Sequence, residues 1–184
     1  IAFCGVCHSD VHAARDEWGG TRFPIVPGHE ITGHVTAVGP AVLNWQVGDA
    51  VGVGCMVNSC RTCSACLEHE EQFCDQGMTA TYNSVDKFGD GSVTKGGYAT
   101  QIVVNEDFVL RIPAGMPLDR TAPLLCAGIT TYSPLHRFGV KPGSMVGIVG
   151  LGGLGHVAVK IAKAMGAHVT MISHSESKRG DAEL

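Results

Sequence analysis

The sequence predicts an α/β plus β protein in which a β-rich region precedes the start of a doubly wound parallel sheet. Short β-rich segments recur through the first 112 residues, and a strand, a glycine turn and a periodic helix follow after residue 144. The 184 residues, 45% of them hydrophobic, provide enough apolar side chain to bury a core.

Four β-rich segments are bounded by glycine, proline or asparagine, which is typical of strands separated by turns. They cover residues 32–38, 49–53, 98–104 and 108–112. A turn at 113–117 follows, and a helical pattern covers 118–138. We therefore predict a first domain over 1–115 and a second over 116–184, with the change of architecture near 113–120.

A glycine-rich turn follows the apolar segment that begins at Met145. It lies before a helix with apolar residues at helical spacing, and 168–173 is typical of a next strand. Glycines permit a sharp turn and let a pyrophosphate approach the helix N-terminus, where free N–H groups favour anions. The pattern predicts the start of a Rossmann nucleotide-binding domain, with a glycine turn that binds no ligand as the alternative. The predicted cofactor residues here are Gly150, Gly152, Gly153, Leu154 and Gly155.

The end of the second predicted strand indicates which nicotinamide nucleotide is bound. An acidic residue about 20 positions past the glycines binds the ribose 2′-hydroxyl of NAD, but Ser173 stands there. Ser173, Ser175 and Lys178, with Arg179 as a further candidate, can instead bind a 2′-phosphate. We therefore predict NADP(H), and expect Glu176 to point toward solvent.

Five of the eight cysteines lie between Cys55 and Cys74, and four of these form a C-x2-C-x2-C-x7-C array. Four thiolates close together in sequence can surround one tetrahedral zinc ion and leave no open position. An iron–sulfur cluster and unligated thiols are the alternatives. The array predicts a structural zinc site made by Cys60, Cys63, Cys66 and Cys74.

A second set of candidate ligands is scattered along the chain. Cys7 lies in a Cys-His-Ser-Asp-Val-His segment, His29 precedes Glu30, and Cys126 follows two leucines. Two cysteines and a histidine leave the fourth position of a zinc ion open, as a catalytic site requires. Taken singly, each residue has a simpler interpretation as a packed or hydrogen-bonded side chain. Together they match the known Cys₂His ligand set of a catalytic zinc, which is a match to a known site rather than a derivation from spacing.

These motifs resemble the zinc-containing medium-chain alcohol dehydrogenases, whose catalytic zinc has the same Cys₂His ligand set. Within that family the chain is most similar to the cinnamyl-alcohol-dehydrogenase branch and its bacterial NADP-dependent aldehyde reductase relatives. The resemblance covers essentially all 184 positions. It rests on residues 4–10, 27–30, 47–51, the four-cysteine array, 96–98, 122–132 and the glycine turn.

The resemblance implies a GroES-like catalytic β-domain followed by a truncated Rossmann domain, with the active site between them. It assigns Cys7, His29 and Cys126 to the catalytic zinc, and Glu30 to an acid that assists ligand exchange. Ser9 would exchange a proton with the substrate oxygen and His12 would relay it to solvent. His8 would lie beside the cofactor phosphates and Thr130 near the nicotinamide. Cys4 and Cys55 receive no role and are interpreted as packing residues.

The predicted function is therefore NADP(H)-dependent interconversion of primary alcohols and aldehydes by a cytoplasmic enzyme with two zinc ions per chain. Its partners would be a small alcohol or aldehyde and, at full length, a second copy in a homodimer. The net charge of −4 argues against a nucleic-acid partner, and no apolar run is long enough to suggest a membrane span. A non-catalytic zinc-stabilised module, a zinc polyol dehydrogenase and a zinc-free quinone reductase are the alternatives.

The two ends of the sequence suggest the middle of a longer protein. The first residue is Ile1 rather than Met, and the polar segment 177–184 ends just after a predicted strand. The second domain would then hold only two strands of its sheet, with unpaired edges. We therefore expect the isolated 184-residue chain to be unstable and inactive.

Overall fold

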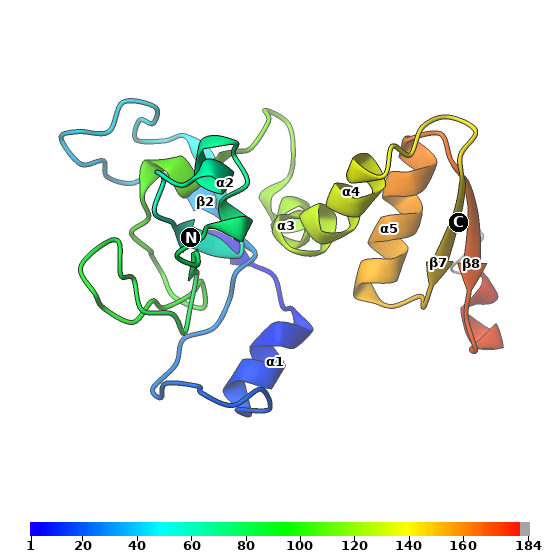
Figure 1. Cartoon of the computed structure of the whole chain (residues 1–184), viewed down its shortest axis with the longest axis horizontal. Coiled ribbons are helices and arrows are strands. Elements are labelled where there is room, and N and C mark those ends of the chain that lie inside the picture. Colours follow the sequence, from blue (N-terminus) through cyan, green and yellow to red (C-terminus); the bar gives the residue numbers. More distant parts are fainter. Residues whose placement is uncertain (181–184) are drawn as a thin grey trace. The chain divides into compact units, whose positions relative to one another are not determined.

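The computed structural model describes residues 1–180 and divides the chain into two compact units, Ile1–Leu125 and Cys126–Leu184 (Figure 1). Residues 181–184, which end the predicted second domain, lie outside the described residues. Compact units and sequence domains need not share a boundary, so the domain limits at 115 and 116 stay a prediction.

The sheet of the first unit is antiparallel and has the order β1-β2-β3-β6. Its strands are β1 (Phe3–Cys4), β2 (Ile31–His34), β3 (Ala50–Val53) and β6 (Leu110–Arg111). In the central pair, Gly33 lies opposite Val51. Buried Ile31 and Val53 form the core of this unit together with Val57. Three of the four predicted strands are thus confirmed, each shorter than expected.

The strand predicted over 98–104 is wrong. The backbone N–H groups of Gly96, Gly97 and Tyr98 donate to the carbonyls of residues 26–28 at 2.7–3.0 Å. Residues 97–100 form a bend and 101–105 have no regular secondary structure. The start of the segment is instead hydrogen-bonded to residues 26–28, which also lie outside any strand.

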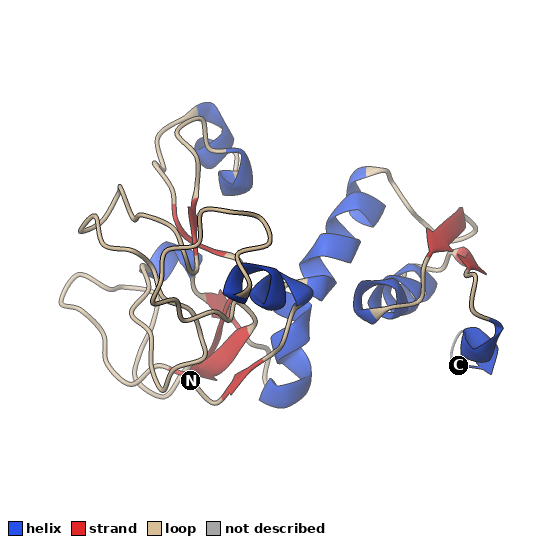
Figure 2. Ribbon diagram, turned by 90° about the horizontal axis from the view of Figure 1, so that it is seen from below, coloured by secondary structure: helices blue, strands red, loops and turns tan. Residues whose placement is uncertain are grey.

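Long loops connect the remaining elements of the first unit, and Figure 2 shows how few of its residues are in strands. β4 (Met56–Asn58) and β5 (Thr79–Ala80) form a second, two-stranded antiparallel sheet. The loop between them contains α2 (Ser64–Leu67) and η1 (Glu71–Phe73), and η2 (Glu106–Phe108) precedes β6. This loop includes the four-cysteine array.

The helix predicted over 118–138 is divided into α3 (Leu118–Thr121), η3 (Ala122–Leu125) and α4 (Ala127–Arg137). Pro123 has no N–H to donate, and Cys126 leaves the helical region with φ −123° and ψ −72°. The first two pieces pack on the sheet. The buried Thr32 hydroxyl donates to the Leu118 carbonyl at 3.0 Å. The side chain of Leu125 lies against Gly52, where an added Cβ would come within 2.8 Å of Leu125 Cδ1.

The second unit contains a parallel strand pair joined by a helix. β7 (Met145–Val149) pairs with β8 (His168–Ile172), and α5 (Gly153–Ala164) connects them. α5 packs against both strands and against α4, and η4 (Glu176–Lys178) follows β8. The predicted strand–helix–strand order is confirmed. None of the described helices has the length and apolarity needed to cross a membrane.

Candidate metal centres

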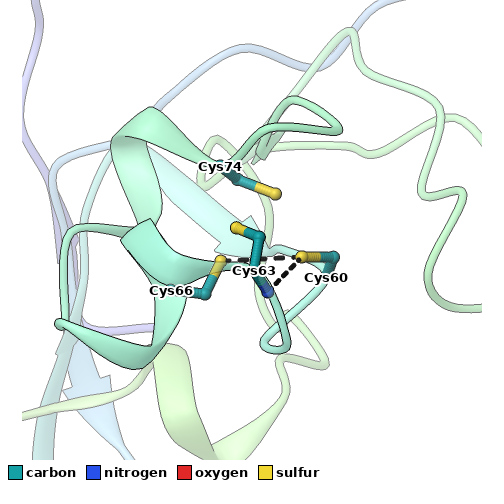
Figure 3. A group of neighbouring side chains, drawn as sticks. All are labelled: Cys60, Cys63, Cys66 and Cys74. Carbon is teal, nitrogen blue, oxygen red and sulfur yellow. Dashed lines mark hydrogen bonds between the residues drawn. The ribbon is translucent and has the colours of Figure 1, made fainter.

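The four cysteines of the array turn their sulfur atoms toward one another (Figure 3). All four Sγ atoms lie within 4.8 Å of one another, and those of Cys60 and Cys66 are 3.8 Å apart. Tetrahedral zinc with Zn–S bonds of about 2.3 Å separates its sulfur ligands by about 3.8 Å. A disulfide would need a separation of about 2.05 Å, and all four cysteines are free. The donor set therefore fits a closed metal site.

The loop that carries these cysteines buries almost no other side chain. Between residues 60 and 74, only Cys66 and Cys74 are buried. The large apolar side chains of this loop, Leu67 and Phe73, are 68% and 57% exposed. A loop whose buried side chains are its candidate ligands has no apolar core of its own, so a bound ion would supply most of its stability.

Backbone N–H groups point at the first cysteine of the array. Hydrogen bonds from the backbone of Thr62 and Cys63 lower the pKa of Cys60 to about 6. The Cys63 nitrogen lies 3.3 Å from the Cys60 sulfur. Between them, Arg61 adopts a left-handed backbone with φ 57°, which is uncommon for a residue other than glycine. At Cys60 the loop is therefore shaped to stabilise a thiolate, the form of cysteine that binds metal.

A buried polar network supports the array from outside. Ser59 is fully buried, and its hydroxyl lies 3.3 Å from the Cys66 sulfur. The Ser59 N–H donates to Asn58 Oδ1 at 3.0 Å. Asn58 Nδ2 in turn donates to both carboxylate oxygens of Asp86, at 3.0 and 3.2 Å. These three residues could not be predicted from the sequence, because their spacing resembles no ligand pattern.

The second candidate site brings together residues that are far apart in sequence. One ligand atom from each of Cys7, His29, Glu30 and Cys126 lies within 4.8 Å of the others. Cys126, the first residue of the second unit, is bonded directly to Leu125 of the first. His29, Glu30 and Cys126 are at most 9% exposed, whereas Cys7 is half-buried. Two sulfurs, an imidazole and a carboxylate in one place fit a zinc ion.

Asp10, which has no role predicted from the sequence, organises this second group. One carboxylate oxygen lies 3.3 Å from His29 Nδ1 and accepts the Gly28 N–H at 3.0 Å. The other accepts the Cys7 N–H and the Tyr98 hydroxyl, each at 2.9 Å. An imidazole that donates from Nδ1 keeps Nε2 free for a metal. Asp10 thus fixes the two segments that carry Cys7 and His29.

The charge state of Asp10 follows from these contacts. Burial, the largest single influence, raises its pKa, since Asp10 is only 4% exposed. Hydrogen bonds from His29, Cys7, Tyr98 and Gly28 outweigh burial and lower the pKa to about 2. Asp10 is therefore a carboxylate at neutral pH, able to accept a hydrogen bond from the imidazole.

Glu30 sits in a notch that only glycine leaves open. Glu30 is 3% exposed, and a Cβ added at Gly5 would fall 2.0 Å from its Oε2 atom. The Gly5 N–H also donates to the Glu30 carbonyl at 3.0 Å. Because Gly5 has no side chain, the Glu30 carboxylate can lie among the candidate ligands.

The residues predicted to move a proton lie on or beside α1 (His8–Ala14). The Ser9 hydroxyl is 3.5 Å from the Cys7 sulfur. The His12 ring stacks on His8 at 4.6 Å between centroids and contacts Trp18 at 4.9 Å.

A ring nitrogen of His12 also contacts a carboxylate. His12 Nδ1 bonds to the Glu17 carboxylate, and this hydrogen bond is the largest of the causes that lower the pKa of Glu17. Glu17 and Trp18 could not be predicted as partners of His12, because α1 ends at Ala14 and the following turn brings them back to the helix.

The glycine turn of the second unit has the tight geometry that its sequence predicts. Gly150 has φ +88°, and Gly152 is the N-cap of α5. A Cβ at Gly155 would fall 1.9 Å from the Gly150 carbonyl oxygen, so this position requires glycine. Gly153 opens α5, and Leu154 is 44% exposed.

The residues predicted to select the cofactor lie after β8. The Ser175 N–H donates to the Ser173 hydroxyl at 3.2 Å, and Lys178 Nζ donates to the carbonyl of Leu151 at 3.0 Å. Lys178 therefore links this segment to the glycine turn. Glu176 is exposed with a side chain 92% accessible, as expected. Thr130 lies in the first turn of α4, where its N–H donates to the Cys126 carbonyl.

The two cysteines without a predicted role differ in their surroundings. Cys4 is half-buried, and its sulfur lies where a Cβ on Gly28 or Gly97 would fall, which agrees with a packing role. Cys55 is exposed, so its interpretation as a packing residue is wrong. Its sulfur lies 3.9 Å from the Leu125 carbonyl oxygen.

Comparison with known proteins gives the same assignment for most of the chain. Residues 1–114 match the alcohol dehydrogenase GroES-like domain. An NADP-dependent alcohol dehydrogenase from Mycolicibacterium smegmatis is 58% identical over 98% of this chain and 52% of its own length. A mannitol dehydrogenase from Petroselinum crispum is 59% identical over 99% of this chain and 53% of its own length.

A solved structure agrees in fold as well as in sequence. The crystal structure of CAD from Helicobacter pylori complexed with NADP(H) has a TM-score of 0.93 and 49% identity, covering 98% of this chain and 52% of that one. The chain thus spans about half the length of these relatives. The predicted GroES-like domain and the predicted family are both confirmed. The chain belongs to the zinc-containing medium-chain alcohol dehydrogenase family.

Proposed function

We propose that the complete protein is a zinc-dependent NADP(H) oxidoreductase that interconverts primary alcohols and aldehydes. The observation that carries this proposal is the convergence of Cys7, His29, Glu30 and Cys126 within 4.8 Å. A non-catalytic module needs only the closed four-cysteine site, whereas two thiolates, an imidazole and an adjacent carboxylate make an open one. The proposal treats residues 1–115 as the catalytic domain and 116–184 as the start of a Rossmann domain.

Cys7, His29 and Cys126 would hold the catalytic zinc. When bound, zinc supplies a Lewis acid that stabilises negative charge on the substrate oxygen. Asp10 keeps the imidazole of His29 oriented, and Glu30 lies close enough to exchange with a ligand. Cys60, Cys63, Cys66 and Cys74 would hold a second, structural zinc, which gives two ions per chain.

Ser9 and His12 would carry the proton that accompanies hydride transfer. The Ser9 hydroxyl lies beside the ligand sulfur of Cys7, so it can exchange a proton with a substrate oxygen bound at this site. His12 lies one helical turn further along α1 and is held by Glu17. Its position suits a group that passes the proton on toward solvent.

The nucleotide would bind at the N-terminus of α5, with its pyrophosphate against Gly150, Gly152, Gly153, Leu154 and Gly155. Ser173, Ser175 and Lys178 would bind the 2′-phosphate, His8 would lie by the phosphates, and Thr130 by the nicotinamide. Support comes from the tight glycine turn and from the relative that was crystallised with NADP(H). A direct test is Ser173→Asp, which should raise NADH use relative to NADPH through repulsion of the 2′-phosphate. An unchanged cofactor ratio would contradict the assignment of these residues.

The substrate is proposed only as a class. The mannitol dehydrogenase from Petroselinum crispum and the NADP-dependent alcohol dehydrogenase from Mycolicibacterium smegmatis are almost equally similar to this chain, at 59% and 58% identity. Polyol oxidation is therefore the second candidate function. Steady-state rates with aliphatic, aromatic and cinnamyl aldehydes and with mannitol would separate the two. The homodimer and the cytoplasmic location are further parts of the proposal.

The decisive experiment removes one ligand of the open site. In the complete protein, Cys126→Ala should abolish turnover, lower the zinc content from two ions to one per chain and leave NADPH binding largely intact. The matched change Cys55→Ala alters an exposed cysteine outside both groups and should keep both ions. Full activity in Cys126→Ala, or one zinc per chain in the unaltered protein, would refute the proposed catalytic site.

A further inference from the structure

Tyr98 reaches the candidate catalytic site from an exposed position. Its side chain is 41% accessible, yet its hydroxyl lies 2.9 Å from Asp10 Oδ2 and 3.2 Å from the Gly5 carbonyl oxygen. Neither metal binding nor proton transfer, as described above, uses this hydroxyl. The contact spans 88 residues of sequence, so it is built by the fold and not by local geometry.

Backbone hydrogen bonds fix the position of the segment that carries Tyr98. Gly96, Gly97 and Tyr98 donate their N–H groups to the carbonyls of Val26, Gly28 and Pro27, at 2.7, 2.8 and 3.0 Å. At Gly97 an added Cβ would lie 2.3 Å from an Ile31 side-chain atom. The segment that carries the tyrosine therefore packs closely against residues 26–28, which directly precede His29.

The carboxylate of Asp10 receives donors from three separate parts of the chain. The Cys7 N–H and the Gly28 N–H come from the two ligand-bearing segments, and the Tyr98 hydroxyl comes from a third. His29 itself is a further donor, and the Tyr82 hydroxyl, whose ring lies beside that of His29, also interacts with this carboxylate. Since a buried carboxylate can rotate when its contacts are incomplete, the hydroxyl restricts the oxygen that does not face the imidazole.

We propose that Tyr98 is a positioning residue for the catalytic metal, acting through Asp10 on the orientation of the His29 ring. This inference rests on the proposed function, because it assumes that His29 binds a metal ion. Tyr98 acts through Asp10 and does not itself bind the metal. Its hydroxyl donates to the Asp10 carboxylate, which in turn orients the His29 imidazole. Residues that hydrogen-bond to a metal ligand in this way tune the metal affinity.

The test is the single substitution Tyr98→Phe in the complete protein, which removes one oxygen and keeps the ring. We expect the affinity of the open site for zinc, measured by competition with a chelator, to fall about 10-fold. With Co²⁺ in that site, the absorption bands of the ion should shift, because they report ligand orientation. The matched control is Tyr132→Phe, since Tyr132 is 42% exposed and its ring stacks on that of His136. It should change neither quantity.

A double-mutant cycle separates positioning from general destabilisation. If Tyr98 acts through Asp10, Tyr98→Phe should have no further effect on metal affinity in an Asp10→Asn background. Independent effects of the two substitutions would overturn the inference. If Asp10→Asn does not fold, the single substitution Tyr98→Phe still tests the inference. Zinc affinity and cobalt spectrum equal to those of the unaltered protein would then overturn it.

The failure of this inference can be told from the failure of the proposed function. If the unaltered protein binds zinc only at the four-cysteine site, the proposed function fails and takes the inference with it. If both ions bind and Tyr98→Phe binds them as tightly as the unaltered protein, the proposed function stands and only the role of Tyr98 is lost.

Discussion

The two candidate metal sites are built in opposite ways. The four-cysteine site draws all its ligands from the 15 residues 60–74, and it lies in a loop that buries little else. The other site joins Cys7 and His29 to Cys126, more than a hundred residues further along the chain. One is a loop organised by its ligands, whereas the other is a set of ligands organised by a fold.

This difference decides what each site would need from the rest of the protein. The loop has its own N–H donors to Cys60, and a buried network through Ser59 connects it to its surroundings. The scattered ligands depend on Asp10, on the notch at Gly5 and on the hydroxyl of Tyr98. Loss of a ligand should therefore unfold structure in the first case and remove chemistry in the second.

The largest expected effect is on the loop. Cys66→Ala removes one of its two buried side chains and one of its four sulfurs, so the zinc ion and the loop structure should be lost together. Comparable sites in zinc-finger peptides contribute about 10–16 kcal/mol of binding free energy. Limited proteolysis should cut between 60 and 74, and the zinc content should fall by one ion per chain.

The companion to this change is Cys126→Ala, which should lose one zinc ion without opening the loop to protease. The pair of substitutions tests the comparison itself. A loop that stays protected in Cys66→Ala would mean that it does not depend on its ion, and the contrast between the two sites would fail.

A smaller effect is expected from the network behind the loop. Ser59→Ala removes the hydroxyl that contacts the Cys66 sulfur. The side chain loses only one oxygen atom, so the surrounding packing should stay the same. Loss of such a partner typically lowers metal affinity about 10- to 100-fold. Zinc release to a chelator should become faster at this site and stay unchanged at the other. Equal release rates in Ser59→Ala and the unaltered protein would show that the hydroxyl only fills space.

The two sites also differ in how far they could be predicted from the sequence. The four-cysteine site is readable from spacing alone, because its ligands and its geometry are both local. The glycine turn is readable for the same reason, since Gly150 and Gly155 meet within a few residues. The scattered ligands could be named only through resemblance to a family, because no spacing relates Cys7 to Cys126.

The supporting residues could not be predicted, because their roles come from contacts between distant segments. Asp10 and Tyr98 are 88 positions apart, and neither is a metal ligand. The failed strand at 98–104 has the same origin: at its start the Tyr98 N–H donates to the Pro27 carbonyl, a contact between distant segments that sequence patterns do not predict. Composition predicts what a segment can form alone, and these segments are defined by their partners.

The smallest effect concerns the notch that seats Glu30. In Gly5→Ala the new Cβ would lie 2.0 Å from Glu30 Oε2, so the flexible carboxylate should move while the backbone stays in place. If Glu30 assists ligand exchange, kcat should fall about 3- to 10-fold, or roughly 1 kcal/mol of barrier, with little change in melting temperature. Gly39→Ala is the matched control, because its added Cβ would meet only a Val42 methyl at 3.9 Å. The contradicting outcome comes from a Glu30→Gln background. If Gly5→Ala lowers kcat there by the same factor, the effect does not act through the Glu30 carboxylate.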